Sequence, residues 1–417
     1  MGQAVSPGAL AILKRLLAWA EKVAALGSLL DGLTDARPQP RIATSVIVRS
    51  LLVMIITRLG SFNAVEQTHS SLFWRRFLDD ALPSADTLGR VAAQLDPDPL
   101  RKALRDLYTD LKRNKALPAP GYGLMPLVLD GHESHSTEQR HCPGCLERKI
   151  STAHGEHVQY YHRHVTAMLL GGDFPILLDA EPQKPGEDEI ATALRLLERL
   201  LSHFPRAFDV VLGDALYTDP RLYNFLLDHG KDVLTVLKNE NRDLLADARC
   251  LFETHSPQRW TEGSTTREVW DLQGFTTWPQ VRQPVRVVRS RETTPSRRQL
   301  DGQIHDQEAD WVWVTTLSAN RASTLAVVAL GHARWSIENQ GFNETTNRWA
   351  ADHVYKHHPT AILILCLMTM LAFNLFYAFF YRNLQPAYRR RHDAQHVARC
   401  LACELYQSLS ETRAPPS

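Results

Sequence analysis

The sequence predicts an α/β fold, and three observations point to it. Short apolar runs alternate with amphipathic helical segments between residues 124 and 237. Helical patterns fill the chain before residue 118, and short alternating segments fill residues 238–319. Because strands that alternate with helices build layered α/β domains, we expect such a domain here, with an all-helical region before it and a β-rich insertion within it.

Composition and charge limit the classes of protein that this chain can belong to. Its 417 residues are 44% hydrophobic and 22% charged, as in a globular protein with room for two or three domains. The net charge of +1 does not mark the whole chain as a nucleic-acid binder, so local basic patches must decide. Six cysteines do not make a disulfide scaffold at this length, and we expect a reducing cytoplasm.

Residues 1–118 are predicted to be an all-helical N-terminal region. Ser84 or Asp86 is a candidate N-cap of one of its helices. Nine basic residues lie between Arg75 and Lys115. They suit either a solvated helical face or a DNA-binding module, and the sequence leaves both interpretations open.

Residues 119–237 are predicted to alternate between strands and helices. The proline- and glycine-rich stretch at 118–121 marks the boundary before them. The expected strands are 124–129, 165–170, 174–180, 208–213 and 232–237, with helices over 187–204 and 220–229.

Residues 238–319 are predicted to form a β-rich insertion with a basic surface. Six arginines lie between Arg282 and Arg298, opposed there only by Glu292, and five tryptophans accompany them. Such a surface suits DNA, because cations neutralise phosphates and aromatic rings stack on bases. Edge-strand charges with core tryptophans are the competing interpretation. The candidate DNA contacts here are Lys238, Arg286 and Arg289.

The chain returns to helix over residues 320–382, and a basic tail follows over 383–417. Residues 360–381 are uncharged, mostly apolar and long enough to span a membrane. A central helix of a large core has the same pattern, and Asn374 interrupts the run. We therefore expect a buried helix and no membrane partner, with a membrane anchor as the alternative.

Three carboxylates are candidates for a metal site. Asp130 and Asp214 each follow an apolar strand, where ligands and metals gather in open α/β sheets. Glu338 lies on a later helix, at the border between a buried and an open face. Converging carboxylates need a cation, and their oxygen atoms favour Mg²⁺ or Mn²⁺. Such a site catalyses phosphodiester chemistry.

The segment around Glu338 is predicted to be one amphipathic helix. Trp335, Phe342 and Trp349 fall seven residues apart and form an aromatic stripe that would fix the helix to the core. Arg334 lies four residues before Glu338. It is either a helix partner of Glu338 or a contact to a DNA phosphate.

These residues resemble the DDE transposases of bacterial insertion sequences, specifically the insertion-sequence-four-like superfamily. The strongest matches are residues 128–131, 211–217 and 334–339. The resemblance implies an RNase H-like mixed sheet with flanking helices, interrupted by a β-rich insertion and preceded by the helical N-terminal domain. Residues 119–237 and 320–382 would be the two parts of the catalytic core.

The resemblance also implies a function. Asp130, Asp214 and Glu338 would hold Mg²⁺ or Mn²⁺ for cleavage at the transposon ends and attack of the freed 3′-hydroxyl on target DNA. A homodimer would bridge two inverted-repeat ends of double-stranded DNA in the bacterial cytoplasm, at the nucleoid. A catalytically inactive DNA-binding protein and a protein anchored in the membrane are the alternatives.

The match to the family pattern Tyr-x2-Arg-x3-Glu-x6-Lys is incomplete. Arg334 and Glu338 match, but Gly331 and Thr345 stand at the tyrosine and lysine positions. Arg348, three residues after Thr345, is the candidate that replaces the lysine as a phosphate contact, although it points to another side of the helix.

A cluster of histidines and cysteines lies between His132 and His164. It contains seven histidines together with Cys142 and Cys145. Two thiolates with two imidazoles bind Zn²⁺ tetrahedrally. The sequence has no second paired motif at a suitable spacing, so a loop with reduced thiols competes with a structural Zn²⁺ site at Cys142 and Cys145.

Overall fold

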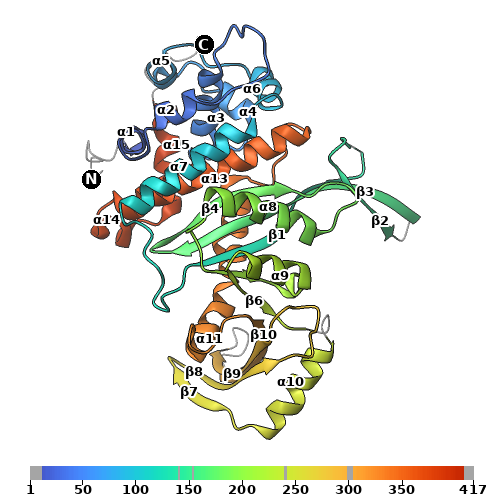
Figure 1. Ribbon diagram of the computed structural model, residues 1–417. Helices are drawn as coiled ribbons and strands as arrows, with labels where there is room; N and C mark the ends of the chain where they lie inside the picture. Colours follow the sequence, from blue (N-terminus) through green and yellow to red (C-terminus); the bar gives the residue numbers. More distant parts are fainter. Residues whose placement is uncertain (1–11, 140, 153–154, 239–241, 298–303, 408–417) are drawn as a thin grey trace. The chain divides into compact units, whose positions relative to one another are not determined.

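The computed structural model describes residues 12–139, 141–152, 155–238, 242–297 and 304–407 (Figure 1). The chain forms two compact units. Unit 1 comprises Met1–Pro118, Gly131–Phe204 and Glu338–Ser417, and unit 2 comprises Ala119–Asp130 and Pro205–Ile337. Two of the points where the chain passes from one unit to the other therefore fall beside the candidate acids Asp130 and Glu338.

The N-terminal part of unit 1 is helical, as the sequence predicts. Its helix α6 is capped by Ser84, whose Oγ accepts a hydrogen bond from the backbone N–H of Thr87 at 3.4 Å. The helices are α1 (Ile12–Ala24), α2 (Leu26–Asp31), α3 (Thr44–Ile56), α4 (Phe62–Glu66), α5 (Leu72–Leu78), α6 (Ala85–Ala92) and α7 (Pro97–Arg113).

Helix α13 (Pro359–Arg382) lies at the centre of the unit 1 core and packs against α3, α7 and strand β4 (Phe174–Pro182) (Figure 1). By length and composition alone it could cross a membrane, but most of its apolar stretch is buried within unit 1. This burial supports the prediction of a core helix over that of a membrane anchor. The later helices of the unit are α12 (Asn343–Trp349), α14 (Pro386–Arg391) and α15 (Ala394–Gln407).

Asn374 is the polar residue in the middle of α13, and its buried side chain is satisfied by two hydrogen bonds to a strand. Its side chain is 1% exposed. Its Oδ1 accepts a hydrogen bond from the backbone N–H of Leu177 at 2.9 Å, and its Nδ2 donates to the carbonyl of Leu177 at 2.8 Å. Leu177 belongs to β4, which pairs with β3 at the side of the sheet, so Asn374 acts as the next partner of this strand.

Replacement of Asn374 by Leu is expected to lower the free energy of unfolding by roughly 2–4 kcal/mol, because two buried backbone groups of Leu177 lose their partner. The urea midpoint of the variant measures this effect. Asn383→Leu, at an exposed position just after α13, is the matched control and should stay near the wild type. Equal midpoints for the two variants would contradict the docking role of Asn374.

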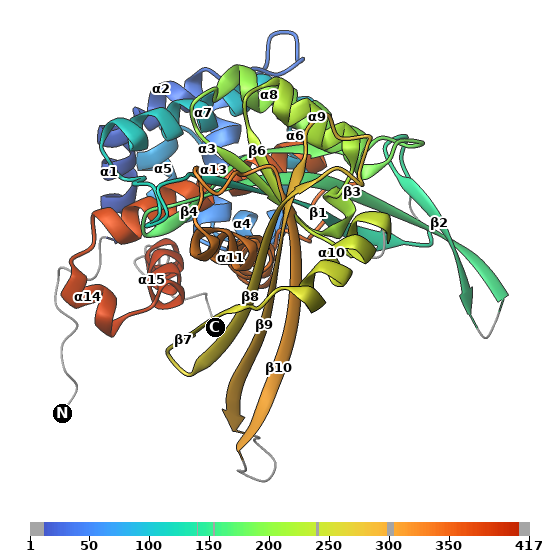
Figure 2. The same ribbon diagram turned by 60° about the horizontal axis from the view of Figure 1, so that its bottom comes forward.

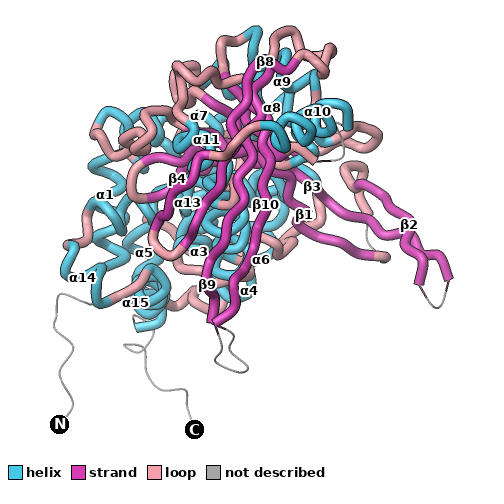
Figure 3. The backbone as a smooth tube through the Cα atoms, turned by 90° about the horizontal axis from the view of Figure 1, so that it is seen from below, coloured by secondary structure: helices cyan, strands magenta, loops and turns pink. Residues whose placement is uncertain are grey.

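The strands of unit 1 are β2 (Leu146–Thr152), β3 (Gly155–Gly171), β4 and the second part of β1 (Pro126–Thr137). The first half of β3 pairs with β2 as a hairpin, and its second half pairs with β4. The β2–β3 hairpin extends beyond the rest of the unit 1 sheet (Figure 3). Helix α8 (Glu189–His203) packs on β3 and β4.

The sheet of unit 2 starts with the first part of β1 and has the order β1-β5-β6-β10-β9-β8-β7. Strands β1, β5 and β6 are parallel, and β10 is antiparallel to β6. Strand β1 belongs to both units, and across it the strand order is β4-β3-β1-β5-β6. This is the order of an RNase H-like core, as predicted. The strands are β5 (Val210–Gly213), β6 (Asp232–Val236), β7 (Gln258–Glu262), β8 (Thr265–Phe275), β9 (Val285–Arg297) and β10 (Ile304–Thr315), with helices α9 (Pro220–Asp228), α10 (Arg242–Thr254) and α11 (Thr324–Ala333).

The predicted β-rich insertion continues the core sheet of unit 2. Strands β8, β9 and β10 run side by side as long ribbons (Figure 2). Trp313 of β10 pairs with Val236 of β6, the last strand before the insertion. The insertion is therefore joined to the core by backbone hydrogen bonds.

Candidate active site

Asp130 and Asp214 lie level with each other at the carboxyl edge of unit 2. Val128 of β1 pairs with Leu212 of β5 in parallel register. Two residues further along the chain, Asp130 still lies within β1, which continues to Thr137 beyond the predicted end of the strand, whereas Asp214 directly follows β5. Neighbouring parallel strands lie about 4.8 Å apart, so this register brings the two aspartates to adjacent positions.

The backbone around Asp214 turns sharply and fixes the carboxylate. Asp214 caps the short 3₁₀ helix Ala215–Tyr217, and its Oδ1 accepts a hydrogen bond from the N–H of Leu216 at 2.8 Å. A Cβ at Gly213 would lie 2.6 Å from Cβ of Tyr217, whose ring is fully buried. The turn after β5 therefore requires glycine at position 213, and the buried tyrosine holds it in place.

Gly131, the residue after Asp130, packs against an acidic side chain that sequence reasoning did not single out. A Cβ at position 131 would lie 2.5 Å from Cδ of Glu189. Glu189 is 7% exposed and forms an ion pair with Arg163 at 2.5 Å. The close approach explains why glycine follows Asp130. No spacing in the sequence links Gly131 to Glu189.

Glu338 lies in the first turn of a π-helical segment, Ile337–Phe342, between α11 and α12. The predicted single helix is therefore wrong: the segment has three parts, and a π turn carries the glutamate. Such turns occur preferentially at functional sites. Glu338 belongs to unit 1 and the two aspartates to unit 2, so the convergence of all three carboxylates stays a prediction.

The predicted aromatic stripe is correct only at its far end. Trp349 is 2% exposed, and its ring packs against Phe373 and Phe376 of α13. Trp335, in contrast, is 37% exposed. Because the helix changes its period between them, positions seven apart do not share one face. Of these two tryptophans, only Trp349 anchors its segment to α13.

The two departures from the family pattern have local explanations. A Cβ at Gly331 would lie 2.3 Å from the indole of Trp313, so the tryptophan takes the space next to α11 where the family has a tyrosine. Thr345 is 8% exposed, and its hydroxyl donates to the carbonyl of Gly341 at 2.9 Å. A lysine at position 345 would have to bury its ammonium group, which is costly.

The predicted DNA contact at Arg286 is wrong. Arg286 is 3% exposed, pairs with Asp271 of the neighbouring strand β8 and donates to the carbonyl of Ala322 at 2.8 Å. Arg289 lies partly exposed over the ring of Trp270, and Asp310 of β10 accepts two hydrogen bonds from it. Arg286 and Arg289 are thus both paired with acidic residues on adjacent strands. Arg298 lies outside the described residues.

The remaining predicted DNA contacts differ in exposure. Lys238 is exposed two residues after the end of β6. Since β6 is parallel to β5, this position lies at the carboxyl edge that also carries Asp130 and Asp214. Arg348 is exposed and pairs with Glu344 at 3.3 Å. Arg334 is 5% exposed, and its guanidinium carbon lies 4.1 Å from the ring centre of Trp335, so the predicted DNA contact at Arg334 is wrong.

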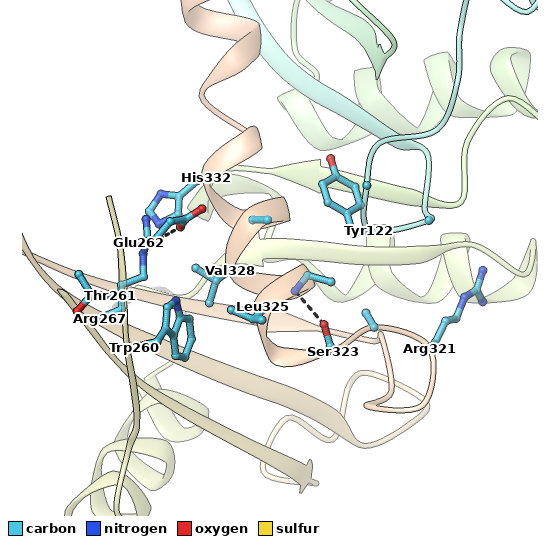
Figure 4. Close-up of a pocket in the computed structure, with 15 residues that line it drawn as sticks. Tyr122, Trp260, Thr261, Glu262, Arg267, Arg321, Ser323, Leu325, Val328 and His332 are labelled. Carbon is cyan, nitrogen blue, oxygen red and sulfur yellow. Dashed lines mark hydrogen bonds and ion pairs between the residues drawn. The ribbon is translucent and has the colours of Figure 1, made fainter. Parts of the chain in front are cut away.

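A pocket of about 1010 Å³ opens within unit 2 between β7 and α11. Figure 4 shows Trp260 of β7 beside Leu325 and Val328 of α11, with Tyr122 across the pocket. Leu325 is 58% exposed, so the pocket offers an accessible apolar wall.

The five tryptophans predicted to accompany the arginines of the insertion differ in burial. Three are buried, namely Trp270, Trp278 and Trp313, and two are half-buried, namely Trp260 and Trp311.

Cys142 and Cys145 lie in unit 1 next to two histidines. The nearby imidazoles belong to His162 of β3 and to His357, which precedes α13. The ligand atoms of all four residues lie within 4.8 Å of one another. The structure thus selects His162 from the cluster seen in the sequence and adds His357, which the sequence did not reveal.

The donors at the carboxyl edge of unit 2 fit a hard divalent cation. Asp130 and Asp214 are both half-buried and offer carboxylate oxygens from adjacent positions, one within β1 and one directly after β5. Two like charges this close repel each other, and a cation between them removes the repulsion. Mg²⁺ and Mn²⁺ prefer such oxygen ligands.

Comparison with known proteins identifies one family. The family described as "Transposase DDE domain" matches residues 126–375, which include the two aspartates, the insertion and Glu338. A search of curated proteins finds no match to this chain.

Proposed function

Because the chain belongs to the family of transposases with a DDE domain, we propose that it cleaves the ends of a mobile DNA segment and joins them to target DNA. The residues proposed for this chemistry are Asp130, Asp214 and Glu338, each as a metal ligand. The observation that carries the proposal is the register of β1 and β5, which brings Asp130 level with Asp214 at the sheet edge.

The three carboxylates would bind the cation from three different parts of the chain. Asp130 would hold the cation from within β1 and Asp214 from the turn after β5, and Glu338 would complete the ligand set from the π turn. When bound, Mg²⁺ or Mn²⁺ activates the attacking oxygen and stabilises the leaving oxygen of the phosphodiester. The attacking oxygen is that of water during cleavage and that of the freed 3′-hydroxyl during strand transfer.

DNA contacts are proposed at exposed cations near this edge. Lys238, two residues after the end of β6, would neutralise a phosphate beside the two aspartates. Arg348 is the second proposed contact, and Arg289 the third, with its charge shared with Asp310. Trp260, in the apolar pocket of unit 2, is the tryptophan proposed to stack on a displaced base.

The assembly and location are part of the same proposal. Two transposon ends must be held at once for joining, so we expect a homodimer that forms on double-stranded DNA. We infer that the DNA substrate is chromosomal, and the protein would then act in the bacterial cytoplasm at the nucleoid.

The test uses labelled duplexes taken from the DNA on each side of the gene, with random duplex as the control. We expect strand cuts at the element boundary in Mg²⁺ or Mn²⁺, none in EDTA, and binding in both conditions. Gel shifts without metal-dependent cuts would overturn the proposal and favour a catalytically inactive DNA binder.

A further inference from the structure

Unit 1 contains a compact group of two cysteines and two histidines from three separate parts of the chain. Cys142 and Cys145 come from the loop between β1 and β2, His162 comes from β3, and His357 comes from the segment before α13. The group lies apart in the sequence from the proposed catalytic carboxylates, and the proposed DNA chemistry does not use it.

The distances within the group fit one tetrahedral ion. The two Sγ atoms lie 3.7 Å apart, and Nε2 of His162 lies 3.4 Å from Sγ of Cys142 and 3.3 Å from Sγ of Cys145. Nε2 of His357 lies 3.3 Å from Sγ of Cys145. Tetrahedral zinc, with bonds of about 2.3 Å to sulfur and about 2.0–2.1 Å to nitrogen, places two sulfurs about 3.8 Å apart and sulfur and nitrogen about 3.6 Å apart.

The same distances disfavour a disulfide. A disulfide requires about 2.05 Å between its sulfur atoms, and both cysteines are free thiols here. Two of the four residues are buried, with Cys145 7% and His162 8% exposed, and Cys142 and His357 are half-buried.

We propose that Cys142, Cys145, His162 and His357 bind a structural Zn²⁺. Two thiolates and two imidazoles are soft and borderline ligands, which select zinc over Mg²⁺. Four protein ligands close the coordination sphere, so the ion has no open position for a reaction.

The role of this ion would be to hold the connector over residues 350–358, which joins α12 to α13. Asp352 of the connector accepts a hydrogen bond from His132 of β1 at 2.8 Å, and the His132 ring stacks on Phe342 at 4.5 Å. His357, near the other end, would be tied to β3 by the metal. The connector that follows the Glu338 segment would thus be fixed at both ends.

The metal content of the purified full chain is the first test. Mass spectrometry of the metals should find one zinc per chain that survives dialysis against a weak chelator. Replacement by Co²⁺ should give the strong visible absorption of a tetrahedral site and a thiolate charge-transfer band in the near ultraviolet. A chain without bound zinc, or a Co²⁺ spectrum without thiolate bands, would overturn the proposal.

Single variants identify the ligands. His357→Gln and Cys142→Ser should each weaken Zn²⁺ binding by about 100-fold or more, since even a residue that only orients a ligand is worth 10–100-fold. The matched controls are His358→Gln, at the exposed neighbour of His357, and Cys403→Ser, at an exposed thiol. Equal losses in His357→Gln and His358→Gln would exclude His357 as a ligand.

Hydrogen exchange tests the role of the ion in holding the connector. Removal of zinc from the wild type should speed amide exchange in residues 350–358 and 142–146, and exchange in the insertion strands should not change. Unchanged exchange in the connector would contradict this role. The result does not depend on DNA cleavage, so the zinc site and the proposed transposase activity can fail separately.

Discussion

Replacement of Asp214 by Asn is expected to reduce the rate of end cleavage by about 10³-fold or more. The substitution keeps the shape of the side chain and its ability to cap the turn at Leu216, since Asn is as good an N-cap as Asp. It removes the negative charge that would hold the metal. A loss of 10³ in rate corresponds to about 4 kcal/mol of transition-state stabilisation.

The cleavage rate is measured under single-turnover conditions on a labelled end duplex, and binding is measured by fluorescence anisotropy. Binding should stay within a few-fold of the wild type. Asp247→Asn, at an exposed carboxylate of α10, is the control for loss of one charge from unit 2 and should cleave normally. A cleavage rate for Asp214→Asn within tenfold of the wild type would exclude Asp214 as a metal ligand.

The substitution Trp349→Ala is expected to lower the free energy of unfolding by about 3–5 kcal/mol, the range for removal of a buried tryptophan. The ring of Trp349 packs against Phe373 and Phe376 and lies 4.4 Å below the guanidinium carbon of Arg58. Its loss leaves a large cavity between α12 and α13. Chemical denaturation followed by circular dichroism measures the change.

Trp335→Ala is the matched control, because the same residue type is removed from a position that is 37% exposed. Its expected cost is about 1 kcal/mol, mainly from the lost contact with Arg334. If the two variants unfold at the same denaturant concentration, Trp349 is not the anchor of its segment.

The order of strands and helices in the core could be predicted from the sequence, because continuous apolar runs mark buried parallel strands. Asp130 and Asp214 were recognisable for the same reason: each ends such a run. Their common level in the sheet could not be predicted, since register depends on pairing between strands more than 80 residues apart.

The shape of the Glu338 segment could not be predicted, because a helical period assumes a constant 3.6 residues per turn. The π turn at Ile337–Phe342 breaks this period, and Trp335 becomes exposed while Trp349 stays buried. The sequence gives no signal for this change of winding.

The arginines of the insertion show a second limit of the sequence. Arg286 looked like part of a basic surface because acidic residues are rare near it in the chain. Its partner, Asp271, lies on the neighbouring strand and forms a buried ion pair with it. Separation along the chain also concealed His357 as a neighbour of Cys142 and Cys145, because His357 lies more than 200 residues away from them.

The central claim is that Asp130, Asp214 and Glu338 bind the catalytic cations together, and metal-specific rescue tests it most directly. Each residue is replaced in turn by Cys, with Asp247→Cys as the control, and end cleavage is measured in Mg²⁺ and in Mn²⁺. A thiolate binds Mg²⁺ poorly, whereas Mn²⁺ tolerates softer ligands. We predict that all three variants are inactive in Mg²⁺ and recover cleavage in Mn²⁺. Wild-type cleavage by Glu338→Cys in Mg²⁺, or no recovery in any of the three, would contradict the claim.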